Sequence, residues 1–177
     1  MNLPNFLTLL RMLMVPLVVL FFALEKPYWA LAVFLLAGFT DVLDGYLARK
    51  NNQITNFGKV MDPLADKLML ITTLICLWVT DRIPGWVPIV IGAKEFTMIT
   101  IAALLYRKDI VLPANFFGKL ATLLFTFAVL LSFFSELVAP WHTVVLYVAT
   151  GVAIFAMIYY GFIVLRSNPH LFKKKNA

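Results

Sequence analysis

The chain has 177 residues, of which 62% are apolar and only 14% are charged, and its mean hydropathy is +0.90. A soluble domain of this length would lack the polar residues needed to cover its surface, so the composition excludes a soluble globular protein. The net charge of +6 fits a protein that lies against anionic membrane lipids, and nothing in it requires nucleic acid as a partner.

Six apolar stretches are each long enough to cross a bilayer as a helix, since each holds the roughly 20 residues that a bilayer core requires. In chain order they are 6–24, 29–48, 60–79, 86–106, 117–137 and 144–165. Backbone polar groups inside a bilayer must be satisfied within each segment. We therefore predict an all-α integral membrane protein with six transmembrane helices, forming a single domain over residues 1–177.

The Lys and Arg residues indicate the orientation, because cytoplasmic flanks hold the excess of them. The opposite side would carry only Lys26 and Arg82, and Lys94 lies inside the fourth stretch. Both termini are therefore predicted to be cytoplasmic. Twelve basic residues would lie on that side: Arg11, Arg49, Lys50, Lys59, Lys67, Arg107, Lys108, Lys119, Arg166, Lys173, Lys174 and Lys175.

The first stretch is expected to stay as a helix. Residues 1–10 carry no positive charge, and no clear cleavage site with small residues follows the apolar run, so a removable signal peptide is not indicated. Within PNFLTLLR, the residues Asn5, Thr8 and Arg11 would lie on adjacent helical turns. At this point two interpretations stay open, namely a ligand-binding role and a plain helix start capped by Asn2 or Asn5.

Four aspartates lie where the second stretch ends and the third begins: Asp41, Asp44, Asp62 and Asp66. Each pair has helical spacing, so each should lie on one face of a helix. Gly45 and Ala48 continue the first face, and Gly58 precedes the second pair, which leaves room for a bulky ligand. Four gathered carboxylates repel one another unless cations neutralise them. Aspartate oxygens are hard ligands that suit Mg²⁺ or Mn²⁺.

The spacing D-x2-D-G-x2-A-R-x8-G-x3-D-x3-D resembles the signature of the CDP-alcohol phosphotransferases, and all eight fixed positions are matched over 26 residues. The resemblance implies that Asp41, Asp44 and Asp62 bind metal, with two ions expected. It implies that Asp66 is the general base and a further metal ligand. It also implies a set of residues that bind the CDP part of the donor: Gly45, Ala48, Arg49 and Gly58.

The opening PNFLTLLR resembles that of bacterial phosphatidylglycerophosphate synthases within this family, where a short juxtamembrane helix precedes the first span. This likeness implies that Asn5 and Thr8 bind the donor. It also implies that CDP-diacylglycerol is the donor and that glycerol 3-phosphate is the acceptor, while the family resemblance as a whole implies a homodimer. The reaction would take place at the cytoplasmic face of a bacterial membrane and contribute to phospholipid biosynthesis.

Lys94 and Lys119 are the candidates for binding the acceptor phosphate. Ionised groups inside a span are costly and mark functional sites, although Lys94 and Glu95 could also pair privately with neighbouring groups. Lys119 is also placed like an ordinary snorkelling lysine. Phosphatidylglycerophosphate synthases typically read A-R-E and G-K-x-K-T at these places, whereas this chain reads AKE and GKLAT.

Two other functions stay open. The form GKLAT looks like that of cardiolipin synthases of the same superfamily, which would use phosphatidylglycerol as the acceptor. A divalent-cation transporter belongs to a different class, and it is conceivable because carboxylates within membrane segments also mark ion paths. Against transport, the aspartates gather at one membrane face with Arg49 among them, whereas an ion path needs polar groups that continue to the other side.

Overall fold

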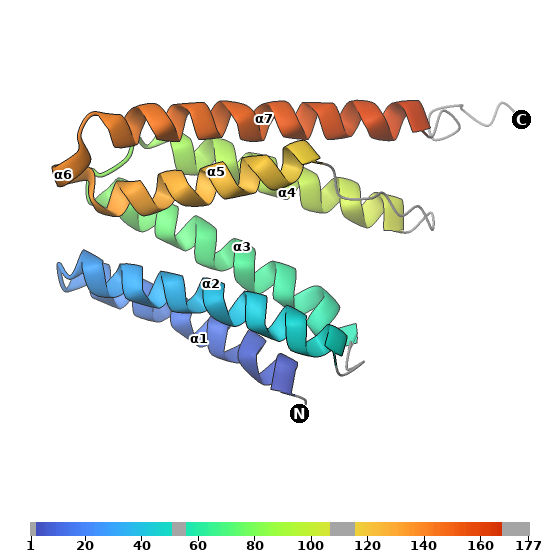
Figure 1. Ribbon diagram of the computed structural model, residues 1–177, viewed down its shortest axis with the longest axis horizontal. Helices are drawn as coiled ribbons and strands as arrows, with labels where there is room; N and C mark the ends of the chain where they lie inside the picture. The colour runs from blue at the N-terminus through green and yellow to red at the C-terminus, as the bar shows by residue number, and fades with distance from the viewer. Residues whose placement is uncertain (1–2, 51–55, 107–115, 168–177) are drawn as a thin grey trace, which may run out of the picture. The chain divides into compact units, whose positions relative to one another are not determined.

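The computed structural model describes residues 3–50, 56–106 and 116–167 (Figure 1). Within these ranges every regular element is a helix, as the sequence predicts. The helices are α1 Leu3–Ala23, α2 Pro27–Lys50, α3 Asn56–Val79, α4 Trp86–Tyr106, α5 Phe116–Phe133, α6 Ser135–Val138 and α7 Trp141–Ser167.

Five of these helices, α1, α2, α4, α5 and α7, are long and apolar enough to cross a membrane. The chain is therefore a multi-pass membrane protein. Helix α3 is long enough to cross, but it carries Asp62, Asp66 and Lys67 in its first half and is not among these five. Six crossings and two cytoplasmic termini stay predictions.

Two helices differ from the expected ones. A separate short helix before the first span was expected, and that expectation is wrong, because α1 continues without a break from Leu3 to Ala23. Pro4 is compatible with this because a proline in the first helical turn removes no intrahelical hydrogen bond. The fifth apolar stretch divides into α5 and α6 on either side of Phe134, and α6 ends before Pro140. The residue that precedes a proline disfavours helical backbone angles.

The chain divides into two compact units, Met1–Ile89 and Val90–Ala177. In the first unit α1 lies against both α2 and α3. Several small side chains lie on the buried faces of these helices beside larger ones such as Leu74, and small side chains let helix backbones approach closely. Val18, Ala30, Ala37 and Ala65 are each at most 1% exposed. This arrangement lets one face of α1 reach residues of two other helices.

In the second unit α5 lies along α7, and the short α6 contacts both helices. Three aromatic rings connect α5 to α7. The ring centroid of Phe117 lies 5.7 Å from that of Phe155 and 5.1 Å from that of Tyr159, both in edge-on geometry. Edge-on pairs of this kind add to the burial of the rings. That residues 1–177 form a single domain stays a prediction.

The contact between Gly85 and Trp78 generates a stability test for the first unit. A Cβ atom at Gly85 would lie 2.4 Å from Nε1 of the Trp78 indole, so Gly85→Ala must displace the ring. Overpacking of this kind costs about 1–3 kcal/mol. We expect a lower melting temperature in detergent and a shifted tryptophan emission. Gly151→Ala is the control, since a Cβ there meets nothing within 4 Å. An unchanged melting temperature for Gly85→Ala would contradict the close contact.

Candidate active site

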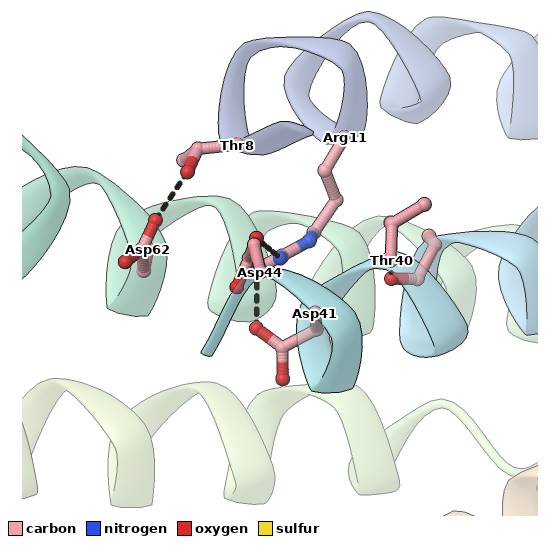
Figure 2. A network of polar contacts seen from close by, with 7 residues as sticks. Thr8, Arg11, Thr40, Asp41, Asp44 and Asp62 are labelled. Atoms are coloured by element: carbon pink, nitrogen blue, oxygen red, sulfur yellow. Dashed lines mark hydrogen bonds and ion pairs between the residues drawn. The ribbon is translucent and has the colours of Figure 1, made fainter. Parts of the chain in front are cut away.

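Three helices of the first unit bring five polar side chains together (Figure 2). Helix α1 contributes Thr8 and Arg11, α2 contributes Asp41 and Asp44, and α3 contributes Asp62. Thr8 and Arg11 are three residues apart, as are the two aspartates of α2, so each pair shares one face of its helix. The sequence motif is thus joined by a face of α1, on which Arg11 lies 33 residues before Asp44 in the chain.

Arg11 is the cation at the centre of this group. Its side chain is 1% exposed, and its Nη1 atom lies 2.5 Å from Oδ1 of Asp41. The Nη2 atom donates a hydrogen bond to Oδ2 of Asp44, whose side chain is only 3% exposed, whereas Asp41 is 42% exposed. A buried carboxylate is costly unless a cation and hydrogen bonds compensate it. Arg11 supplies that compensation for the buried member of the motif.

Thr8 contacts the other half of the motif, which lies on α3. Its hydroxyl, which is buried, donates a hydrogen bond to Oδ1 of Asp62 on α3. Thr8 therefore fixes one oxygen of Asp62, while Arg11 holds the carboxylates of α2. One turn of α1 connects the two aspartate-bearing helices.

The remaining motif residues are placed only in part. Asp66 lies one turn after Asp62 on α3 and is exposed, and Gly45 follows Asp44 on α2 and is half-buried. The backbones of four further residues belong to α1, α2 and α3, but their side-chain surroundings lie outside the described residues. These are Asn5, Ala48, Arg49 and Gly58. Their roles in donor binding stay predictions.

The two lysines expected to bind the acceptor belong to the second unit. The Nζ atom of Lys94 on α4 lies 2.6 Å from Oε1 of the buried Glu95. Lys94 therefore forms an ion pair with its neighbour in the chain, which the sequence allows as an alternative to acceptor binding. Lys119 is exposed near the start of α5. Their role in binding the acceptor phosphate stays a prediction.

The aspartates suit a divalent ion by their chemistry, since carboxylate oxygens are the ligands that Mg²⁺ and Mn²⁺ prefer. In the structure, however, Asp41 and Asp44 contact Arg11 of α1, and Asp62 accepts a hydrogen bond from Thr8 of α1. In the part of the chain that the structure describes, no three Asp, Glu, His or Cys side chains stand ready to share a metal ion. The Arg11 guanidinium lies where Asp41 and Asp44 attract a cation. The aspartates can therefore bind a divalent ion if their carboxylates contact the ion in place of the Arg11 guanidinium.

Arg11 is the residue that the sequence prediction undervalued. The sequence places it among the cytoplasmic flanking charges and leaves it, with Asn5 and Thr8, between a ligand-binding role and a plain helix start. A signal was present, because a basic residue inside an apolar helix normally faces a partner or a cavity. The spacing of Thr8 and Arg11 on one face of α1 was a second signal.

Comparison with known proteins covers nearly the whole chain. Residues 1–166 match the family model described as CDP-alcohol phosphatidyltransferase. A CDP-diacylglycerol–glycerol-3-phosphate 3-phosphatidyltransferase of Bacillus subtilis is 38% identical over 136 residues, which cover 68% of this chain and 70% of that protein. A probable phosphatidylglycerophosphate synthase of Mycobacterium tuberculosis is 34% identical over 89% of this chain and 77% of its own length. A CMP-forming cardiolipin synthase of Streptomyces coelicolor is 37% identical over 74% of this chain and 65% of its own length.

The burial of Arg11 predicts a large effect on stability. Arg11→Met leaves Asp44 buried without its cation, and breaking a buried pair in this way costs about 3–5 kcal/mol. Thermal unfolding in detergent with a chelator should show a marked fall in melting temperature. The double variant Arg11→Met with Asp44→Asn should recover part of the loss, because the uncompensated charge is removed. A single variant as stable as the wild type would show that the pair contributes nothing to the resting protein.

Proposed function

The chain belongs to the CDP-alcohol phosphatidyltransferase family, and we propose that it transfers a phosphatidyl group from CDP-diacylglycerol to glycerol 3-phosphate. The products are phosphatidylglycerophosphate and CMP. The observation that carries the proposal is the complete aspartate motif, whose Asp41, Asp44 and Asp62 face α1 from two neighbouring helices. The names of the relatives from Bacillus and Mycobacterium support glycerol 3-phosphate as the acceptor.

Each aspartate has a role in the proposed reaction. Asp41, Asp44 and Asp62, joined by Asp66, hold two divalent ions, Mg²⁺ or Mn²⁺. When bound, such ions neutralise the diphosphate of the donor and stabilise the departing CMP. Thr8 keeps Asp62 oriented through its hydrogen bond. Asp66 is exposed and one turn along α3, a position that suits a base which meets an incoming acceptor.

The transfer is a single displacement. The acceptor hydroxyl oxygen forms a bond to the phosphorus that carries the diacylglycerol, the bond from that phosphorus to the CMP oxygen breaks, and Asp66 takes the hydroxyl proton. CMP leaves with the electron pair. No covalent enzyme intermediate is required, because the carboxylates are committed to metal binding and proton transfer.

Residues around the motif bind the donor. Gly45, Ala48 and Gly58 leave space for the cytidine and ribose, since they have almost no side chain. Arg49 pairs with phosphate oxygens in bidentate fashion. Asn5 and Thr8 contribute from α1, where Thr8 already lies beside the motif.

The acceptor phosphate is assigned to Lys94 and Lys119. One observation favours a second candidate, cardiolipin synthesis from phosphatidylglycerol. Glu95 already neutralises Lys94, so little positive charge is left at this position. Glycerol 3-phosphate, a dianion, needs more compensating positive charge than a diester with a single negative charge. The cardiolipin synthase from Streptomyces supports the same alternative. Family membership favours either enzyme over a divalent-cation transporter.

The proposed setting is a bacterial cell membrane. The chain forms a single domain over residues 1–177, crosses the bilayer six times and has both termini and the aspartate motif on the cytoplasmic side. The distribution of basic residues supports this orientation. We further propose that the enzyme is a homodimer, as the family resemblance implies.

Removal of one metal-ligand charge tests the site. Asp62→Asn keeps the shape of the side chain but loses its charge, so phosphatidyl transfer should fall by more than roughly 100-fold. Mutation of a residue that only hydrogen-bonds to a metal ligand already lowers activity or metal affinity about 10–100-fold. CMP release from CDP-diacylglycerol measures the loss. Asp81→Asn is the matched control, because Asp81 is an exposed aspartate in the loop after α3. Near-normal turnover of Asp62→Asn at saturating Mg²⁺ would make the metal assignment wrong.

A panel of acceptors tests the substrate. Purified protein is incubated with labelled CDP-diacylglycerol and either glycerol 3-phosphate or phosphatidylglycerol, and the lipids are separated. We expect phosphatidylglycerophosphate from the first acceptor. Lys94→Ala and Lys119→Ala should each raise the apparent KM for glycerol 3-phosphate far more than the KM for the donor. Cardiolipin from the second acceptor, with no product from the first, would establish the alternative.

A further inference from the structure

We propose that Arg11 is a positioning residue that serves as the resident counter-ion of the aspartate motif, and that a divalent ion must displace it from Asp41 and Asp44. The inference rests on the metal binding in the proposed function. Its starting point is Figure 2, in which Arg11 reaches both aspartates of α2 from the neighbouring helix.

Burial explains why Asp44 needs such a cation. Asp44 is 3% exposed within a helix of a membrane protein, where an unpaired carboxylate is strongly disfavoured. Arg11, at 1% exposure, is the cation that meets it. Arg11 therefore holds the two aspartates of α2 in place and joins helix α1 to α2.

The pairing is also incomplete, which makes it replaceable. The guanidinium divides between two carboxylates instead of forming the stronger two-bond fork with one. Its Nη1 atom is 2.5 Å from Oδ1 of Asp41, yet neither Nη1 nor the buried Nε makes a hydrogen bond of good geometry among the described residues. Buried donors without acceptors raise the free energy of the resting state. Asp41 is 42% exposed, so solvent and ions reach this side of the pair.

Charge decides the direction of the effect. A guanidinium within hydrogen-bonding distance of two carboxylates lowers their attraction for a divalent ion, and it also occupies Oδ1 of Asp41 and Oδ2 of Asp44. Removing Arg11 should therefore tighten metal binding. A rival role, in which Arg11 stays in place and orients the carboxylates for the metal, predicts weaker binding after the same change. The two roles thus differ in sign.

The test is a Mn²⁺ titration of the purified protein in detergent, without donor or acceptor, followed by electron paramagnetic resonance. Arg11→Gln should lower the dissociation constant roughly tenfold or more, since the change removes a unit positive charge from beside the two carboxylates. Arg11→Lys should lower it less, because a single ammonium keeps the charge but cannot bridge both carboxylates. Thr8→Val is the control, since it frees Asp62 from a hydrogen bond without changing any charge.

Equal or weaker Mn²⁺ binding by Arg11→Gln would overturn the proposal. If that variant does not fold, Arg11→Lys gives the same decision, because it retains the charge and must still bind Mn²⁺ more tightly than the wild type. A tightening by Thr8→Val as large as that by Arg11→Gln would also overturn it. Absence of Mn²⁺ binding in the wild type and in every variant would instead remove the metal from the proposed function.

Discussion

The buried ion pair between Arg11 and Asp44 is the interaction that makes this site possible in a membrane. A carboxylate that is 3% exposed within a transmembrane helix requires a partner, and the partner comes from a different helix. Arg11 also reaches Asp41, so one side chain orders both aspartates of α2. The same burial that makes the motif costly without a cation makes it a strong attractor for cations.

Helix α1 combines two functions along one buried face. Apolar residues of this face pack against α2 and α3, and Val18, seven residues after Arg11, is fully buried. Near the start of the helix the same face carries Thr8 and Arg11, which contact α3 and α2 respectively. The family motif occupies only α2 and α3, yet the geometry of its carboxylates is completed by α1. A motif described from two helices is therefore a site built from three.

The helices were largely predictable, because length and hydrophobicity decide which segments can cross a bilayer. The predicted limits of α4, 86–106, coincide with the observed ones. The division of the fifth stretch at Phe134 was not predicted, because Ser135 and Glu136 interrupt the apolar residues only briefly before Leu137 and Val138. The gathering of Asp41, Asp44 and Asp62 beside one another was predictable from their helical spacing. The pairing of Arg11 with Asp44 was not, because the spacing of residues along one helix does not say which neighbouring helix its polar face will meet.

An experimental structure of the protein with Mn²⁺ and CDP tests the proposed competition between Arg11 and metal. Anomalous scattering would locate the ions independently of any assay. We predict Mn²⁺ bound by Asp41, Asp44 and Asp62, with the Arg11 guanidinium no longer contacting the first two. Mn²⁺ bound at another place, with Arg11 still paired to Asp41 and Asp44, would contradict the site described for this protein.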